Sequence, residues 1–371
     1  MKAVFSYLVV FVFFGLVAPN TLAADAVKLG MSAPFSGPTK HLGQATREGA
    51  QAYFNKYNAT PEGKQTPIEL ITYDDGYEPH NTYKNTLKLI QEDKVFALFN
   101  YVGTPTSKAI LPLVKRYNIP YLFPYTGAEF LRWPVVDQVY NFRGSYYQEA
   151  ETLVNYFVKK HRIKKAGLFI QSDAFGIEAS RGYVKALNRK WITNTFQVRY
   201  RRNSEDIAHA IEQMKAQKPD VIFAVGTYQP VSQLVNELRR DNINTPVATL
   251  SFSGAEALRT HLENFEQIYI STVFPNPKAS DLPVIQEYRE DMAGHELSHE
   301  SLEGYLNAKL FTEMIKKSKK PITHESFIIS TESHLFDLGG LALRYSAENH
   351  STLLPITLNK VTKEAIVEIK D

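Results

Sequence analysis

The feature that most constrains the fold is a regular alternation of short apolar runs of β type with amphipathic runs of helical spacing. Residues 27–123 and 165–250 each hold four strand patterns separated by three helical patterns. The predicted strands are 27–32, 68–73, 95–99, 119–123, 165–171, 193–199, 221–225 and 247–250, and the predicted helices are 45–57, 82–90, 105–117, 174–188, 207–217 and 231–240. Such alternation predicts parallel sheets covered by helices. We therefore expect an α/β protein with two doubly wound lobes.

The two series meet near residues 141–145, where a strand pattern ends and a polar stretch containing Gly144 precedes a helix from Glu149. The material after residue 250 can complete the two lobes by crossing back, without forming a third domain. Ligands of open α/β sheets bind beyond the carboxyl ends of the strands. We expect a ligand cleft between the lobes.

The first 24 residues have the layout of a secretory signal peptide, with Lys2 before a short apolar run and alanines at 23, 24 and 26. We expect cleavage between residues 23 and 26. The apolar run is short for a membrane span, which needs about 20 residues; an uncleaved anchor is the alternative. Nothing else in the sequence is apolar enough to enter a membrane.

The chain has no cysteine. Disulfides, a thiol nucleophile and a lipid-bearing cysteine are therefore excluded, and we expect release into the periplasm without a lipid anchor. Lysine and arginine number 42 against 39 acidic residues, without a basic cluster. This balance argues against a nucleic-acid partner.

The loop 100–107 is the most informative candidate binding element. It follows a buried-type strand, and Gly103, Thr104 and Pro105 suit the start of a helix. The free N–H groups of that helix, with the hydroxyls of Thr104, Thr106 and Ser107, could receive a carboxylate. Plain helix capping is the alternative.

Aromatic side chains recur in the loops that follow strands. An organic ligand could stack against them, although packing between the lobes would also explain them. They are Tyr101, Tyr125, Phe175 and Tyr228, with Tyr146 and Tyr147 just after the junction.

With these loops in place, the chain resembles the periplasmic substrate-binding proteins of branched-chain amino acid ABC transporters, the leucine/isoleucine/valine-binding type. The resemblance runs from Val27 almost to the end of the chain, and it depends on the order and spacing of several segments. They read VKLGMSAPFSGPTKHLGQATREGAQAYFN, ITYDDGYEP, VFALFNYVGTPTSKAILPLV, IPYLFPYTGAEFLR, YNFRGSYYQEAETLV, QSDAFGIEA and SLEGYLNAKL.

The resemblance implies a type I periplasmic binding fold, with two lobes joined by three crossovers and closing on ligand like a hinge. It places residues 27–143 and 253–341 in one lobe, and residues 144–250 and 345–371 in the other. It further implies a membrane permease as partner of the closed form. We expect a monomer without cofactor or catalytic residues.

The resemblance also implies ligand-binding positions. The carboxylate-binding hydroxyl falls on Thr104, a second group on Tyr125 with Thr126 or Gly127, and the ammonium-binding tyrosine on Tyr228. Amino-acid binders of this family carry an acid where this chain has Ser251, and the nearest acid here is Glu256. An ammonium group buried without a carboxylate is costly, so a carboxylate or amide without an amine fits equally well.

A competing motif is His295-Glu296-x-x-His299, the H-E-x-x-H signature of zinc hydrolases. It requires both histidines on one face of one helix. Gly294 is suited to end a helix, and Ser298 to cap the next one. We therefore expect no metal site here, and we consider a zinc hydrolase the weaker hypothesis. A second alternative is a periplasmic ligand sensor on the same fold.

Overall fold

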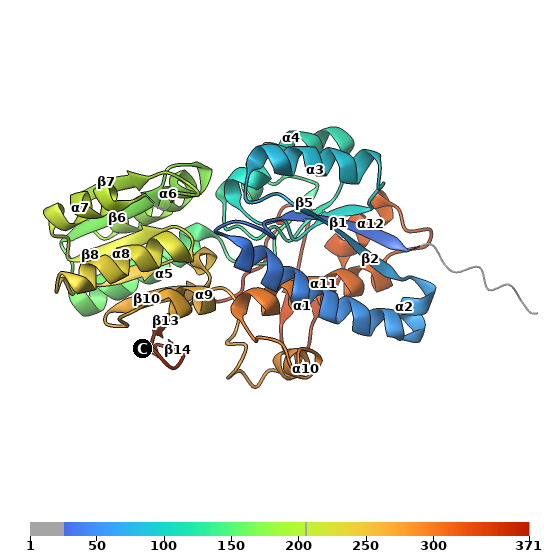
Figure 1. Cartoon of the computed structure of the whole chain (residues 1–371). Helices are drawn as coiled ribbons and strands as arrows, with labels where there is room; N and C mark the ends of the chain where they lie inside the picture. The colour runs from blue at the N-terminus through green and yellow to red at the C-terminus, as the bar shows by residue number, and fades with distance from the viewer. Residues whose placement is uncertain (1–25, 205, 371) are drawn as a thin grey trace, which may run out of the picture.

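The computed structural model describes residues 26–204 and 206–370. It contains two large sheets, each covered by helices, which form two lobes side by side (Figure 1). The expected α/β class with two doubly wound lobes is confirmed. The predicted signal peptide, residues 1–24, lies outside the described residues. Within the described part of the chain, no helix combines the length and hydrophobicity needed to span a bilayer.

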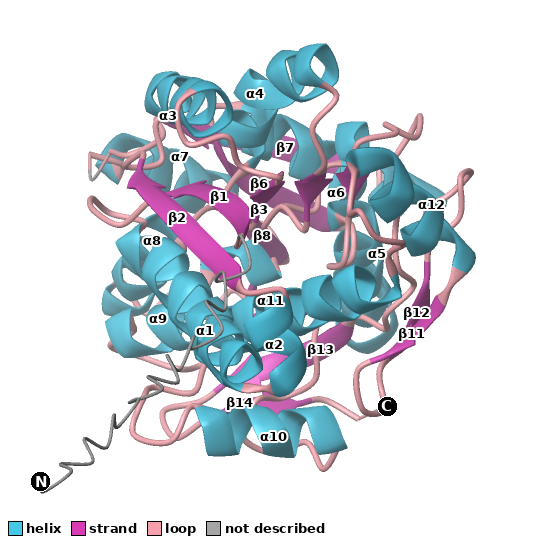
Figure 2. Cartoon of the chain, turned by 90° about the vertical axis from the view of Figure 1, so that its right-hand side faces the viewer, coloured by secondary structure: helices cyan, strands magenta, loops and turns pink. Residues whose placement is uncertain are grey.

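The first lobe is built on five parallel strands in the order β2-β1-β3-β4-β5. Figure 2 shows this sheet between α3 and α4 on one face and α1 and α11 on the other. The strands are β1 (Val27–Ala33), β2 (Ile68–Asp74), β3 (Ala97–Phe99), β4 (Tyr121–Leu122) and β5 (Val139–Tyr140). The helices are α1 (Lys40–Ala59), α2 (Pro61–Gln65), α3 (Pro79–Gln91), α4 (Thr104–Tyr117), α10 (Pro283–Asp291), α11 (His299–Lys317) and α12 (His324–Ser333), with the hairpin β11 (Leu335–Asp337) and β12 (Ala342–Arg344).

The second lobe is built on seven strands in the order β14-β13-β10-β9-β8-β6-β7. The pairs from β10 to β7 are parallel, and β13 and β14 join antiparallel. The strands are β6 (Lys165–Gln171), β7 (Asn194–Tyr200), β8 (Val221–Val225), β9 (Val247–Thr249), β10 (Ile268–Thr272), β13 (Thr357–Val361) and β14 (Ile366–Glu368). The helices are α5 (Tyr146–Tyr156), α6 (Ala174–Arg189), α7 (Ala208–Gln217), α8 (Tyr228–Arg240) and α9 (Ala255–His261).

The expected start of the second segment of the first lobe at residue 253 is wrong. Strand β10 pairs with β9 and β13 in the second sheet. The chain adds one more strand to the second sheet before it crosses back. Strand β10 is buried along its whole length, as suits a position inside that sheet. Residues 253–272 therefore belong to the second lobe.

Helix α1, from the first segment of the first lobe, packs against α11, from the second segment. His41 lies near Glu300 at one end, and Lys316 lies over the ring of Tyr57 at the other, so the two helices run parallel. Two glycines allow their backbones to touch. A Cβ on Gly49 would lie 1.8 Å from the carbonyl oxygen of Ser301, and one on Gly304 would lie 1.9 Å from that of Thr46.

We expect Gly304→Ala to lower the free energy of unfolding by about 1–3 kcal/mol, because the added methyl would force the two backbones apart. Chemical denaturation measures the change. Gly30→Ala is a suitable control, since its Cβ would meet only the end of the Leu89 side chain, at 3.0 Å. An equal loss in both variants would contradict close helix packing as the cause.

Candidate functional site

Three hydroxyl groups meet where the first lobe faces the second. Thr104 begins α4 after β3, Thr126 follows β4, and Tyr146 begins α5 of the second lobe. The Oγ1 atoms of Thr104 and Thr126 are 2.7 Å apart, and the Tyr146 hydroxyl lies 3.2 Å from the first and 3.1 Å from the second. All three residues are fully buried. We call them the hydroxyl cluster.

Helix α4 begins differently from the expectation. Gly103, with a φ of 112°, is the N-cap, and Thr104 is the first helical residue, so its hydroxyl is free to join the hydroxyl cluster. The hydroxyls of Thr106 and Ser107 bond to the carbonyl oxygen of Gly103. They serve the helix start, and the expectation that they face a ligand is wrong.

Five aromatic rings fill the space next to the hydroxyl cluster. Phe252 of the second lobe lies at their centre, with ring centroids 4.5 Å from Phe175, 5.6 Å from Tyr125, 6.2 Å from Tyr77 and 6.4 Å from Tyr146. We call these five residues the aromatic cluster. Tyr77 and Tyr125 come from the first lobe, so the rings join the two lobes.

Gly127 allows this close approach. A Cβ there would lie 2.5 Å from the backbone nitrogen of Tyr146, which donates to the carbonyl oxygen of Gly127 at 2.8 Å. Gly127 thus allows α5 to pack against the loop that carries Thr126. Gly127 contributes to the site through this close backbone contact, without a side chain.

Arg143 lies at the first crossover, and its side chain is 1% exposed. Its guanidinium stacks over Tyr125, with 4.1 Å from Cζ to the ring centroid, and donates from Nη2 to the Ser251 hydroxyl. Nη1 lies 3.8 Å from Glu303, while Nε and Nη1 have no hydrogen-bond partner. Burial raises the pKa of Glu303 to about 7, against the opposing charge of Arg143.

Ser251 follows β9 and is held from two sides. Besides the Arg143 bond, its backbone N–H donates to the carboxylate of Glu149 at 2.8 Å, which also accepts from the Ser271 hydroxyl at 2.6 Å. Glu149 is fully buried. The side chain facing Ser251 is therefore a cation. Both hydrogen bonds to Glu149 reach Oε2, and its buried Oε1 has no hydrogen-bond partner.

Tyr228 occupies a different place from the aromatic cluster. It begins α8, and its ring packs against His261 at 4.8 Å and His41 at 6.2 Å. These residues line a cavity of about 620 Å³ between the lobes, together with Glu256 and Glu296. We call this space the outer cavity. The predicted binding residues are thus divided between the outer cavity, the hydroxyl cluster and the aromatic cluster.

Tyr101 does not face the cleft as expected. Its hydroxyl lies 3.1 Å from that of Thr86 on α3, and its ring packs on Tyr121 at 5.5 Å. It faces the interior of the first lobe because the loop turns its side chain towards α3.

A pair of polar contacts joins the lobes beyond the aromatic cluster. Arg202 and Asn203, after β7, each donate to the Glu78 carboxylate at 2.7 Å. Arg202 also donates to the carbonyl oxygen of Tyr77. The described arrangement is therefore closed, with direct contacts between the facing edges of both lobes.

The H-E-x-x-H motif has the geometry of a break between helices. Helix α10 ends before Gly294, which has a φ of 86°, and Ser298 is the N-cap of α11 with a capping box. His295 lies in the connector, and His299 is the first residue of α11. The predicted interruption is confirmed, and no group of metal-binding side chains is found in residues 26–204 and 206–370.

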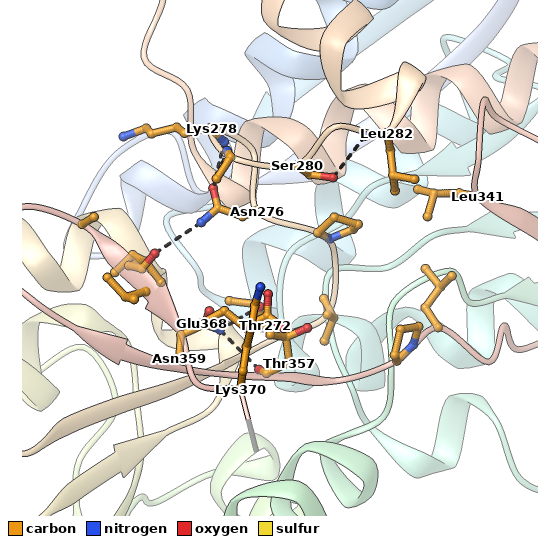
Figure 3. A pocket seen from close by; sticks show the side chains of 18 of the residues that line it. Thr272, Asn276, Lys278, Ser280, Leu282, Leu341, Thr357, Asn359, Glu368 and Lys370 are labelled. Carbon is orange, nitrogen blue, oxygen red and sulfur yellow. Dashed lines mark hydrogen bonds between the residues drawn. The ribbon is translucent and has the colours of Figure 1, made fainter.

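A second cavity, of about 940 Å³, lies where the crossovers leave the second lobe. Figure 3 shows Thr272, Asn276 and Leu341 around it, with Thr357, Asn359 and Lys370 from the C-terminal strands. It contains none of the predicted binding residues, and Glu256 is shared with the outer cavity.

Sequence reasoning missed Phe252, Tyr77, Arg143, Glu149 and Glu303. Phe252 lies two residues after the predicted strand 247–250, and Tyr77 lies four residues after the predicted strand 68–73. The rule that selected the other aromatics would therefore have found both. Arg143 and Glu303 are far apart in sequence, and nothing in either local segment marks them as neighbours.

The chain matches the family model described as periplasmic binding protein over residues 26–365. A Leu/Ile/Val-binding protein, BraC3, from Rhizobium johnstonii is 24% identical over 219 residues, which are 58% of each chain. A Leu/Ile/Val-binding protein homolog from Brucella suis is 20% identical over 325 residues, covering 82% of this chain and 80% of the relative.

Solved structures give the same result over nearly the whole length. A possible leucine/isoleucine/valine-binding protein from Rhodopirellula baltica is 30% identical, with a TM-score of 0.89, covering 95% of this chain and 98% of the other. A branched-chain amino acid ABC transporter structure from Thermus thermophilus with bound valine shares the fold, with a TM-score of 0.83, 17% identity and coverage of 94% and 97%. Together with the two lobes and three crossovers, these matches show that the chain belongs to the periplasmic binding proteins, of the branched-chain amino acid type.

Proposed function

We propose that the protein is an exported solute-binding protein that captures a small organic ligand between its lobes and delivers it to an ABC importer. The observation that carries the proposal is the hydroxyl cluster, in which Thr104 and Thr126 of one lobe meet Tyr146 of the other. A ligand bound to these groups contacts both lobes at once. It therefore favours the closed form by its differential affinity for that form.

The charges near the hydroxyl cluster favour a carboxylate or amide. Arg143 is buried with unpartnered N–H groups, and it faces Ser251, where an ammonium-binding acid would be needed. Oε2 of Glu149 accepts from Ser251 and Ser271, while its Oε1 is buried without a partner, and burial raises the pKa of Glu303 to about 7. A ligand whose acidic or polar group lies beside Arg143 fits such surroundings best. Phe252 and its neighbours would contact the rest of the ligand.

Ligand capture is tested by a thermal-shift screen of the purified protein against amino acids, aromatic acids, amides and short carboxylates. A ligand at about 100 times its Kd stabilises the protein by about 2.7 kcal/mol. We expect hits among the carboxylates or amides. The delivery step is tested by uptake of a radiolabelled hit into cells with and without this chain.

For any hit, we expect the Thr104→Val, Thr126→Val double variant to bind about 10–100-fold more weakly, because two hydrogen-bonding groups are lost. Isothermal titration calorimetry measures the affinity. Thr152→Val is the control, since its hydroxyl bonds only to the carbonyl oxygen of Gln148 within α5. Unchanged affinity in the double variant would place the ligand elsewhere.

A further inference from the structure

Two helix N-termini face each other across the lobe boundary, and each supplies a glutamate to the other. Glu256, the second residue of α9, accepts from the backbone N–H of His299 at 3.3 Å and lies 3.2 Å from its Nδ1. Glu300, the second residue of α11, accepts from the backbone N–H of Ala255 at 2.9 Å. We call Ala255, Glu256, His299 and Glu300 the reciprocal clasp.

The reciprocal clasp connects the lobes through an ion pair as well as through backbone caps. Helix α9 belongs to the second lobe and α11 to the first, so the His299–Glu256 pair forms only when the lobes meet. Glu256 is 3% exposed and Glu300 is fully buried, which makes an unpaired charge here costly.

Other charged groups around the reciprocal clasp stay with the first lobe. His41 on α1 lies 3.8 Å from Glu300, a pair that survives opening. Burial opposes ionisation of Glu300, but His41 and His299 lower the pKa of this carboxyl to about 2, so it remains an anion at neutral pH. Lys278 acts on His299 from the loop before α10, and Glu296 acts on His41 from the connector before α11. Glu256 also acts on His41, across the lobe boundary.

The proton on His299 is therefore sensitive to whether the cleft is closed. Burial disfavours its charge, but the carboxylates of Glu256 and Glu300 together outweigh burial and raise the pKa of His299 above its usual value. Opening removes Glu256 together with the burial, and leaves Glu300 beside the imidazole. We take the lost pair with Glu256 to outweigh the recovered hydration, so the closed form binds the proton more tightly. Closure then gains free energy at low pH and loses it as pH rises through the raised pKa.

We propose that the reciprocal clasp makes cleft closure proton-dependent, with His299 as the titrating group, so that the protein closes more readily in acidic than in alkaline surroundings. The proposal deepens the proposed function, because it adds a regulator of the same cleft. His299, a residue of the apparent zinc motif, would thus control the closing of the lobes.

The chain offers a direct test because it has no native cysteine to interfere with labelling. Spin labels on Lys84→Cys in α3 and Ala216→Cys in α7 would report the distance between the lobes, since both positions are exposed. The distance distribution is measured on the full chain without ligand at about pH 6 and about pH 9. We expect the closed-to-open ratio to change about tenfold for each pKa unit by which His299 differs between the two forms.

Two variants assign the effect to His299. In His299→Asn, the amide can replace Nδ1 as a donor to Glu256 but cannot titrate, so the pH dependence should weaken by the contribution of His299. His41 and Glu303 keep their contributions in both chains. His295→Asn removes a neighbouring exposed histidine and should keep the dependence. A ratio that is independent of pH in the parent chain, or that titrates equally in His299→Asn, would overturn the proposal. Since no ligand is used, this result is independent of the ligand screen, which alone decides the proposed function.

Discussion

Phe252→Ala is expected to shift the protein towards an open form and to abolish tight ligand binding. The ring contacts Tyr77 and Tyr125 of the first lobe and Tyr146 and Phe175 of the second. Truncation of a buried phenylalanine typically costs about 3–5 kcal/mol. Because half of these partners lie across the cleft, a large part of that loss falls on the closed form.

Small-angle X-ray scattering measures the opening as an increase in radius of gyration. Phe327→Ala is the matched control, because Phe327 is equally buried but lies inside the core of the first lobe. That variant should melt at a lower temperature without becoming more extended before it unfolds. A Phe252→Ala protein as compact as the parent would contradict a closing role for this ring.

Arg143→Met is expected to lower the free energy of unfolding by about 3–5 kcal/mol at about pH 9, where it leaves the buried Glu303 carboxylate without its cation. Near neutral pH the loss should be smaller, because Glu303 without Arg143 is protonated. In the parent, Glu303 has a pKa of about 7 in the folded chain, above its usual 4.5. Its stabilising contribution is therefore present below about pH 4.5 and lost as pH rises through about 7. Removing Arg143 raises the pKa of Glu303 in the folded chain further. The pH range over which stability falls therefore extends to higher pH.

Denaturant titrations of Arg143→Met between about pH 5 and pH 9 measure this slope. The Arg143→Met, Glu303→Gln double variant provides the control, since it removes both charges and should regain part of the stability with a weaker pH dependence. Equal stability of the single variant at both ends of the range would show that Glu303 is not the group left unpaired.

The architecture could be predicted from the sequence because local pattern determines most of it. The apolar runs at 165–171 and 221–225 coincide with β6 and β8, and Gly294 with Ser298 separates α10 from α11 as expected. The lobe boundary was missed because the short sequence of β10, IYIST, could belong to a strand of either sheet. Only its pairing with β9 and β13 assigns it.

The site was predictable where it depends on strand ends, and not where it depends on distant partners. Thr104, Thr126 and Tyr146 follow strands of the first sheet and Phe175 follows a strand of the second. They come together because the carboxyl ends of both sets of parallel strands face the boundary between the lobes. Tyr101 follows the same rule and still turns inwards, since a contact with Thr86 decides its direction. The Arg143–Glu303 pair joins segments that no periodicity relates.

The contact between α1 and α11 also limits the order in which the chain can fold. The backbones that touch at Gly49 and Ser301 are separated in sequence by most of the second lobe, from α5 to β10. The first lobe therefore cannot complete its helical layer until the ribosome has produced almost the whole chain, and such distant pairing slows folding. Truncation before residue 299 is expected to leave one face of the first sheet covered by α1 without α11, and a shortened chain of this kind would be a substrate for proteases.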